Sequence, residues 1–236
     1  MTAEPAREAK DALFDAFASI ARALGNGRRA EIVDLLAQGE RSVDEVATEI
    51  GQSVANTSHH LRHLAGAGLL QSRRDGQRII YRLTSARVAE LWSSLRDLAA
   101  THVAEVEVLA DAYLGDERAV ERITAEELAE RMDRGRVVVL DVRPSSEYRS
   151  GHIRGARSMP ITELEHGADA LPTSRDVVAY CRGPYCVYAD DAVRLLHERG
   201  HRARRLDVGY PEWERAGLPT EAGEPEGTTP EEQIAS

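Results

Sequence analysis

Two cysteines, Cys181 and Cys186, have the clearest chemical potential in this sequence, because both lie in one short segment. The residues between them are Arg182, Gly183, Pro184 and Tyr185. An apolar, strand-like run ends at Cys181, and a helical pattern begins just after Cys186. A cysteine in a tight strand-to-helix loop is close to backbone N–H groups and to the positive end of the helix, which both favour the thiolate. We therefore predict that Cys181 is a nucleophile that can carry sulfane sulfur as a persulfide, with its pKa lowered by loop amides and Arg182.

Cys186 admits two interpretations. It can be a small, partly buried side chain at the start of the helix, or a resolving thiol that attacks Cys181 once that residue carries extra sulfur. The attack would leave a disulfide or a polysulfide bridge, and four intervening residues favour the longer bridge because it strains the loop less. Two cysteines in 236 residues do not form a disulfide scaffold, so we expect a cytoplasmic protein.

A second group of candidate residues is basic, although the chain has a net charge of −10. Between positions 53 and 87, six arginines accompany one acidic residue, Asp75, which gives a local charge of 6 − 1 = +5. A basic stripe on an acidic protein is typical of a DNA-binding surface, although it can also be an ordinary solvated surface. The candidate DNA-contacting residues are Asn56, Thr57, Ser58, His59, His60, Arg62, His63, Arg73, Arg74 and Arg78.

The elements that position these polar residues follow from apolar spacing and capping signals. Helices are predicted over residues 7–24 and 28–37. Ser42 and Glu45 have the spacing of a capping box, which opens a short helix to Ile50, and Ser53 caps a helix to about residue 65. Residues 69–74 and 78–83 are strand-like runs around a hairpin turn. A helix-turn-helix followed by a basic hairpin predicts a winged helix, whose second helix meets base edges while the wing arginines reach phosphates.

The rest of the chain divides into a long helix and a second domain. Residues 86–114 form one helical pattern, whose apolar stripe exceeds what so small a domain needs and therefore predicts a dimer interface shared with the first helix. Residues 115–122 are the expected linker. A helix at 125–134, strands at 137–142, 176–181 and 202–206, and a helix at 187–199 then predict a parallel α/β sheet. Residues 221–236 are rich in Glu, Gly, Pro and Thr and are expected to be a disordered tail.

Three segments of the first half, Arg41–Ala47, Ser58–Leu70 and Arg73–Leu83, resemble the ArsR family of bacterial repressors. The resemblance implies a DNA-binding and dimerisation domain over residues 1–114 and a homodimer that leaves a two-fold operator when an inducer arrives. Metal-sensing members of the family often carry a Cys-x-Cys pair before the recognition helix, whereas residues 43–50 contain no cysteine. His102 and Glu105 supply only half of another site of the family. We therefore expect no metal ion in this domain and place the sensor elsewhere.

Three segments of the second half resemble rhodanese domains. Leu140–Tyr148 and Gly151–Ala156 match the amino-terminal signature of those domains, and Gly209–Pro219 matches the carboxy-terminal one. The resemblance covers residues 123–220, implies a rhodanese-like α/β fold, and places the nucleophile at Cys181 in an active-site loop that ends at Cys186. The residues expected to stabilise the fold without a catalytic role are Asp141, Arg143, His152 and Trp213.

The sequence thus predicts a multidomain protein with a mainly-α winged helix-turn-helix followed by an α/β rhodanese-like sheet. The favoured function is a transcriptional repressor that responds to reactive sulfur, or to another thiol-directed signal, through Cys181. One alternative is a thiosulfate or polysulfide sulfurtransferase that carries a DNA-binding domain; another is an arsenite or soft-metal sensor that uses both thiolates. The expected partners are operator DNA, a second copy of the chain and a small sulfur-containing inducer or donor. We expect no cofactor, and no membrane contact because no apolar run reaches about 18 residues.

Overall fold

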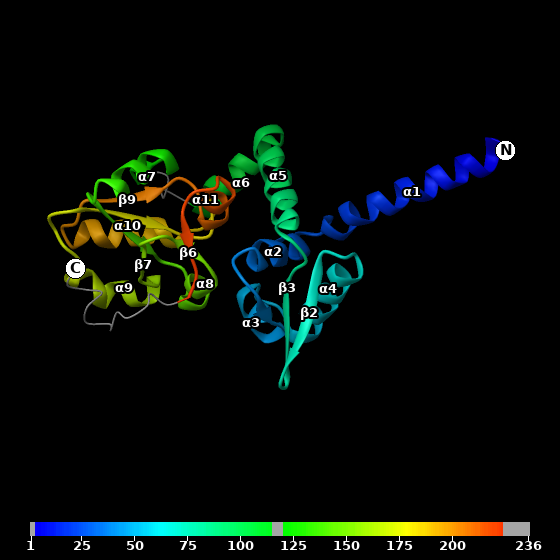
Figure 1. Cartoon of the computed structure of the whole chain (residues 1–236), viewed down its shortest axis with the longest axis horizontal. Coiled ribbons are helices and arrows are strands. Elements are labelled where there is room, and N and C mark those ends of the chain that lie inside the picture. The colour runs from blue at the N-terminus through cyan, green and yellow to red at the C-terminus, as the bar shows by residue number, and fades with distance from the viewer. Residues whose placement is uncertain (1–2, 115–119, 224–236) are drawn as a thin grey trace. The chain divides into compact units, whose positions relative to one another are not determined.

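The computed structural model describes residues 3–114 and 120–223. The chain forms two compact units, residues 1–99 and 100–236, which are shown in Figure 1 and described separately below. The division lies ahead of the linker expected at 115–122, of which residues 115–119 are outside the described residues. Most of the expected tail, 224–236, is also outside them, whereas Glu221 belongs to the last strand of the fold.

Unit 1 is a helical domain with a small antiparallel sheet of order β1-β3-β2. Its elements are α1 (Ala3–Leu24), α2 (Gly27–Leu36), β1 (Arg41–Ser42), α3 (Val43–Glu49), α4 (Val54–Gly66), β2 (Leu70–Asp75), β3 (Arg78–Leu83) and α5 (Ala86–His102). The predicted winged helix-turn-helix is confirmed, with α3 and α4 as the helix pair and β2 and β3 as the wing.

Local sequence signals explain the helix-turn-helix. The Ser42 hydroxyl accepts a hydrogen bond from the Glu45 N–H, and the Glu45 carboxylate accepts one from the Ser42 N–H at 2.7 Å, which completes the predicted capping box. Gly51 turns the chain with a φ of 61°, a conformation that glycine adopts without steric cost. The Ser53 hydroxyl then caps α4 by accepting from the Asn56 N–H.

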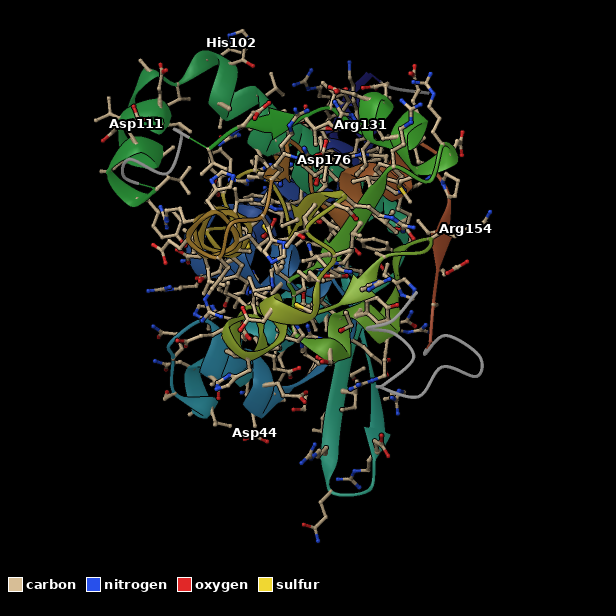
Figure 2. The ribbon with its side chains drawn as sticks, turned by 90° about the vertical axis from the view of Figure 1, so that its left-hand side faces the viewer. Asp44, His102, Asp111, Arg131, Arg154 and Asp176 are labelled. Atoms are coloured by element: carbon tan, nitrogen blue, oxygen red, sulfur yellow. The ribbon has the colours of Figure 1, made fainter. Side chains whose placement is uncertain are left out.

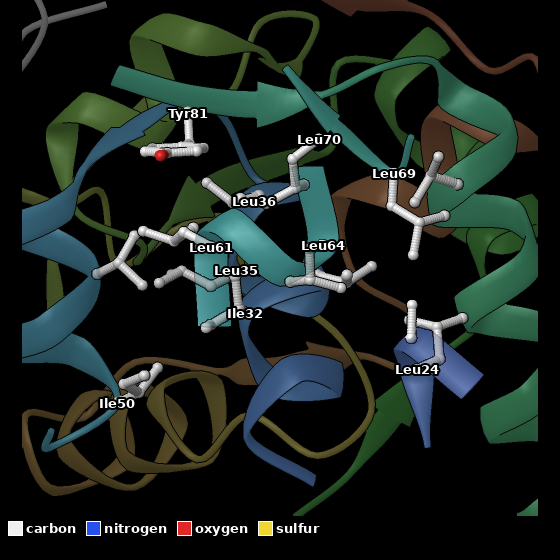
Figure 3. Packing of buried hydrophobic residues seen from close by; sticks show 14 residues of the cluster. Leu24, Ile32, Leu35, Leu36, Ile50, Leu61, Leu64, Leu69, Leu70 and Tyr81 are labelled. Atoms are coloured by element: carbon white, nitrogen blue, oxygen red, sulfur yellow. The ribbon is translucent and has the colours of Figure 1, made fainter. Parts of the chain in front are cut away.

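The core of unit 1 is a set of leucines and isoleucines with Tyr81 at its edge (Figure 3). Leu61 and Leu64 of α4 are fully buried, and they pack in one cluster with Ile32 of α2 and Leu70 of β2. Burying each such side chain stabilises the fold by roughly 1.5–3 kcal/mol. This packing fixes the orientation of α4 and therefore decides which of its residues face the solvent.

The single helix predicted over residues 86–114 is wrong. The structure has two helices, α5 (Ala86–His102) and α6 (Ala104–Leu114), which are separated at Val103. Thr101, His102 and Val103 are three successive residues of low helix propensity, and the β-branched Thr and Val lose side-chain freedom in a helix. The apolar spacing continues across the break, which is why the periodicity did not reveal it.

Unit 2 contains a five-stranded sheet of order β4-β9-β8-β5-β7, with every neighbouring pair parallel. Besides α6, its elements are β4 (Arg122–Ile123), α7 (Ala125–Asp133), β5 (Val137–Asp141), α8 (Ser145–Ser150), β6 (His152–Ile153), β7 (Arg157–Ser158), α9 (Ile161–Gly167), a 3₁₀ turn (Ala168–Ala170), β8 (Asp176–Tyr180), α10 (Tyr188–Glu198), β9 (Ala203–Leu206), α11 (Tyr210–Arg215) and β10 (Thr220–Glu221). Strands β6 and β10 form a separate antiparallel pair. The predicted parallel α/β sheet is confirmed, although β4, β6, β7 and β10 were not foreseen.

Strand β8 is the middle strand of the sheet, and its two faces belong to two different cores. Val177, Ala179 and Cys181 join one core, and Val178 and Tyr180 join the other. This alternation is the two-residue period of a strand covered on both sides. Cys181 therefore lies just past the carboxyl end of the central strand, on the face that packs against α10. Carboxyl ends of parallel strands are the usual position of ligand and active sites in α/β sheets.

Among the described helices, none combines the length and the apolar character needed to cross a lipid bilayer.

Candidate functional site

The loop between β8 and α10 brings the two cysteines together. Cys181 is buried, with 2% of its surface exposed, whereas Cys186 is half-buried, as are Pro184 and Tyr185. The Cys181 Sγ lies 3.5 Å from the carbonyl oxygen of Cys186 and 3.8 Å from that of Gly183. A thiol donates to carbonyl oxygens and a thiolate cannot, so these contacts favour the protonated form of Cys181.

The two thiols interact with each other, and this interaction makes their pKa values unequal. Burial raises the pKa of the Cys181 thiol well above its usual value, and the hydrogen bond with Cys186 raises it further. The same hydrogen bond, in which Cys181 donates, lowers the pKa of Cys186 to about 7, helped by the backbone N–H groups of Arg182 and Tyr188. Our prediction that Cys181 has a lowered pKa is therefore wrong for this loop: a backbone hydrogen bond with Gly183 does lower the pKa of Cys181, but burial and Cys186 outweigh it.

Arg182 anchors the loop instead of acting on Cys181. Its guanidinium donates to the carboxylate of Glu147, with Nη2 at 2.6 Å and Nε at 3.0 Å from Oε1. Glu147 is fully buried on α8, and the guanidinium also lies over the ring of Tyr188, 5.5 Å from its centroid. The arginine ties the loop to α8, and its charge makes a smaller contribution to lowering the pKa of Cys186.

A buried arginine on β9, Arg205, binds the backbone of the loop, and no pattern in the sequence predicts this contact. The Arg205 Nη2 donates to the carbonyl oxygens of Gly183 at 3.0 Å and of Pro184 at 3.1 Å, and its Nη1 forms an ion pair with Asp190 of α10. Both partners of the ion pair are almost completely buried. The charge of Arg205 also opposes the effect of burial on the pKa of Cys181. Arg205 follows Arg204 in the strand, and no local signal tells which of these two faces the core.

The carboxy-terminal segment fixes the same loop through Gly209. A Cβ atom at Gly209 would lie 2.4 Å from both the Arg182 carbonyl carbon and the Gly183 nitrogen, so only glycine fits there. The next residue, Tyr210, donates its backbone N–H to the carbonyl oxygen of Cys181 at 3.2 Å. The segment after β9 therefore packs directly on the backbone of the cysteine loop.

The residues expected to stabilise the rhodanese-like fold are buried and hydrogen-bonded, in agreement with that role. Arg143 pairs with Asp141 at 2.6 Å and donates to the Gly151 carbonyl at 2.7 Å, while the Tyr180 hydroxyl donates to Asp141 at 2.6 Å. The His152 ring stacks on Tyr148, and the Trp213 indole N–H donates to the Pro219 carbonyl.

The candidate DNA-binding residues all lie on α4 or on the wing, and all except one are at least partly exposed. Thr57 is fully buried and faces the core, because positions 57, 61 and 64 share one face of α4. Thr57 therefore cannot contact DNA, and this spacing in the sequence was the missed signal. Ser58 and His60 are half-buried, and the exposed candidates are Asn56, His59, Arg62, His63, Arg73, Arg74 and Arg78.

The exposed candidates are not electrostatically equal. Arg73 forms ion pairs with Glu40 and with Asp75, the latter at 3.2 Å, so its charge is compensated in the free protein. Arg74 forms no ion pair with any described residue. Burial and the charge of Arg29 lower the pKa of His60, which is therefore neutral at pH 7. Arg74 is thus a stronger candidate for a phosphate contact than Arg73 or His60.

Comparison with known proteins decides the family. Residues 26–72 match the bacterial regulatory proteins of the arsR family, and residues 124–216 match the rhodanese-like domain. The HTH-type transcriptional regulator Rv0324 of Mycobacterium tuberculosis (strain ATCC 25618 / H37Rv) is 45% identical over 218 residues, which cover 92% of this chain and 96% of that protein. The chain belongs to the ArsR family of transcriptional regulators. This ArsR regulator carries its rhodanese-like domain on the carboxy-terminal side of the DNA-binding domain.

Two further comparisons each cover one part of the ArsR regulator. A protein of Allochromatium vinosum named "Sulfurtransferase" is 34% identical over 110 residues, which are 46% of this chain and 99% of that protein. The solution structure of a homodimeric winged helix-turn-helix domain, fragment 1–100 of Mb0332 from Mycobacterium bovis, is 42% identical, covers 41% of this chain and 89% of that one, and has a TM-score of 0.39.

Within residues 3–114 and 120–223, no three His, Cys, Asp or Glu side chains converge in a way that could hold a metal ion. The described loop offers two soft metal ligands, Cys181 and Cys186, which are fewer than the three side chains sought for a metal site. The chemistry that this arrangement supports is therefore thiol and sulfur chemistry at a pair of hydrogen-bonded cysteines.

Proposed function

We propose that this ArsR regulator is a repressor that responds to reactive sulfur, or to another thiol-directed signal, at Cys181 and Cys186. The observation that carries the proposal is that one loop holds both cysteines, with the Cys181 Sγ 3.5 Å from the backbone carbonyl oxygen of Cys186. A proton held between two thiols leaves one negative charge on the pair at a pH above about 7, the pKa of Cys186. An ionised cysteine with a second thiol within hydrogen-bond reach is the arrangement that a reversible disulfide switch requires.

The chemical step can be written with polysulfide as the oxidant. One cysteine thiolate attacks a sulfane sulfur of the polysulfide, the S–S bond beyond that sulfur breaks, and a polysulfide anion shorter by one sulfur leaves. The other cysteine then attacks the Cβ-bound sulfur of the resulting persulfide, forms the Cys181–Cys186 disulfide and releases hydrosulfide, which takes up the thiol proton. The two cysteines lose two electrons in total, and the transferred sulfane sulfur gains them.

Which cysteine attacks first differs between the sequence-based prediction and the geometry. The rhodanese resemblance places the nucleophile at Cys181, whereas burial and hydrogen bonding favour ionisation of Cys186, which is also the more exposed residue. Attack by Cys186 followed by resolution at Cys181 gives the same disulfide. Cys181→Ser and Cys186→Ser variants separate the two orders, because only the variant that keeps the first attacker accumulates a persulfide.

The dimer proposed for this repressor is supported by two exposed apolar faces of unit 1. Leu13, Phe14 and Phe17 of α1 are 51–62% exposed, and Leu91, Leu95 and Leu98 of α5 are 38–56% exposed. Figure 1 shows that the amino-terminal part of α1 extends beyond the rest of its unit. Two helices with uncovered apolar side chains favour a symmetric pair of chains in which each copy covers the other.

One helix of the proposed dimer face, α5, also connects the two units along the chain. Helix α5 carries part of that face and leads through Val103 into α6 of unit 2. Any modification in unit 2 that changes operator affinity must change the free-energy difference between the free and DNA-bound dimers. We place that coupling on α5, because it is continuous with both units.

The test is an anisotropy titration of the full chain with duplex DNA from the promoter of its own gene. Treatment with polysulfide, with the product verified by intact mass, is expected to weaken binding at least tenfold in the wild type. The Cys181→Ser and Cys186→Ser proteins should change less than twofold, because neither can form the disulfide. Unchanged DNA binding by protein shown to carry the disulfide would refute the proposal.

A sulfurtransferase is the second candidate function, and the 34% identity to the Allochromatium vinosum sulfurtransferase favours it. Steady formation of thiocyanate from thiosulfate and cyanide, lost in Cys181→Ser, would support it. In that case polysulfide would serve as a substrate, and DNA affinity would not depend on the state of the cysteines. The arsenite or soft-metal hypothesis has no supporting observation beyond the two thiols themselves.

A further inference from the structure

Three neighbouring strands of unit 2 each begin directly after an arginine. Arg136 precedes β5, Arg175 precedes β8 and Arg202 precedes β9. The register pairs Val137 with Asp176 and Val177 with Ala203, so the three strands start side by side. Because the strands are parallel, the three arginines gather at the amino edge of the sheet, opposite the edge that holds the cysteine loop.

Helix α7 ends at the same edge and adds two more arginines. The Arg131 Nη1 lies 3.0 Å from Asp176 Oδ2, and Figure 2 shows these two labelled residues next to each other. The Arg202 Nε donates to the other oxygen of the same carboxylate at 2.8 Å. The carboxylate of Asp176 therefore accepts hydrogen bonds from two guanidinium groups. The second arginine of α7, Arg134, lies just after the last turn of the helix.

These side chains line a cavity of about 560 Å³. Its charged residues are Arg131, Arg134, Arg136, Arg175, Arg202 and Asp176. Arg131 and Arg134 also pair with glutamates of α7, and arginines at the carboxyl end of a helix are favoured by its dipole. Arg136 and Arg175 have neither explanation, since they form no ion pair with any described residue. Five arginines here face three carboxylates, those of Asp176, Glu127 and Glu130, and the two positive charges in excess favour the entry of an anion into the cavity.

A second cavity of about 380 Å³ shares Arg175 with the first. Its walls include the apolar side chains of Met132, Val137 and Trp213. Arg157 also borders it, and burial together with the charge of Arg175 lowers the pKa of Arg157. Arg175 thus lies where a strongly basic cavity meets a partly apolar one.

We propose that this edge of the rhodanese-like domain binds a small phosphate ester, with its phosphate among Arg136, Arg175 and Arg202 and its apolar part in the adjacent cavity. Guanidinium groups bind phosphate oxygens in pairs of parallel hydrogen bonds, which is the geometry that several arginines at one edge can offer. The volumes of the two cavities are in the range of small-molecule sites. The site is independent of the cysteines and of the sulfur response proposed above.

The test is calorimetric titration of the full chain at low ionic strength, where screening is weak, with phenyl phosphate and with inorganic phosphate. Phenyl phosphate is expected to bind at least threefold more tightly than inorganic phosphate, because its ring reaches the apolar cavity. An Arg136→Ala/Arg175→Ala protein should lose at least tenfold in affinity for phenyl phosphate. The matched control is Arg194→Ala/Arg199→Ala, which removes two paired arginines of the same unit, and it should change less than twofold.

Two results would overturn the proposal. One is the absence of measurable binding to the wild type, and the other is equal binding by the double variant and the control. A third arm titrates the same proteins with duplex DNA of unrelated sequence. If the double variant binds this DNA more weakly while phenyl phosphate binds no better than inorganic phosphate, the phosphate comes from a DNA backbone and the small-ligand assignment is wrong. Thermal unfolding checks the fold, and Arg136→Gln/Arg175→Gln replaces the alanine variant if that protein does not fold.

Discussion

Cys181→Ala is the substitution that tests the thiol pair most directly. The hydrogen bond from Cys181 is the largest cause that lowers the pKa of Cys186 from an ordinary 9.0 to about 7. At a given pH, a pKa about two below the ordinary value makes the ratio of thiolate to thiol about a hundredfold larger. The backbone N–H groups of Arg182 and Tyr188 remain in the variant, so the pKa of Cys186 should stay partly lowered. We expect the pKa of Cys186 to rise by on the order of one unit in Cys181→Ala.

The measurement is the rate of alkylation of Cys186 by iodoacetamide between pH 5.5 and 10, followed by intact mass. In Cys181→Ala, Cys186 is the single cysteine, so the profile reports one thiol. With a pKa of about 7, Cys186 should be about one tenth thiolate at pH 6 and about nine tenths at pH 8 when the hydrogen bond is present. Cys181→Ser is the matched control, because its hydroxyl can still donate to the thiolate. The reasoning is refuted if the alanine and serine variants titrate with the same pKa.

Three further substitutions test the remaining contacts. Arg205→Met removes the guanidinium that pairs with the buried Asp190 and should lower the free energy of unfolding by about 3–5 kcal/mol in urea titrations; adding Asp190→Leu should recover most of that loss. Arg74→Ala should reduce the slope of log affinity against log salt for DNA by about one unit, whereas Arg73→Ala should reduce it less because Arg73 is already paired in the free protein. Phe14→Glu places a charge on the exposed face of α1 and should shift the chain toward monomer in light scattering; an unchanged dimer mass would show that this face is not the interface.

The features of unit 1 that the sequence predicts correctly depend on local signals. Ser42 and Glu45 are three residues apart, and their capping box forms as expected because it needs only neighbouring backbone groups. The wing follows from two strand-like runs around Gly76, which turns the chain with a φ of 58°. The burial of Thr57 could be predicted from its spacing to Leu61, because residues four apart lie on the same face of a helix. Its polar side chain alone placed it among the candidate DNA-contacting residues.

Features of unit 2 that depend on contacts between distant segments were not predictable. Strands β4, β6, β7 and β10 have two residues each and exist because another strand pairs with them, so they have no apolar pattern of their own. The sequence also could not indicate which backbone N–H groups of the loop point to which sulfur, because that depends on the conformation of the loop. The resemblance to rhodanese domains located the loop, but the state of its two thiols follows from the hydrogen bonds of this particular chain.

Three contacts that shape the cysteine loop do not involve sulfur. Arg182 joins it to Glu147, Arg205 joins it to Asp190, and Gly209 packs on its backbone. A buried ion pair often adds little net stability, because the desolvation of two charges offsets their attraction. Two such pairs on one loop are therefore better explained by the conformation they impose than by the stability they add. Since these three contacts do not depend on the thiols, replacing either cysteine should leave the loop folded, and changes in reactivity of the variants can be assigned to the lost sulfur itself.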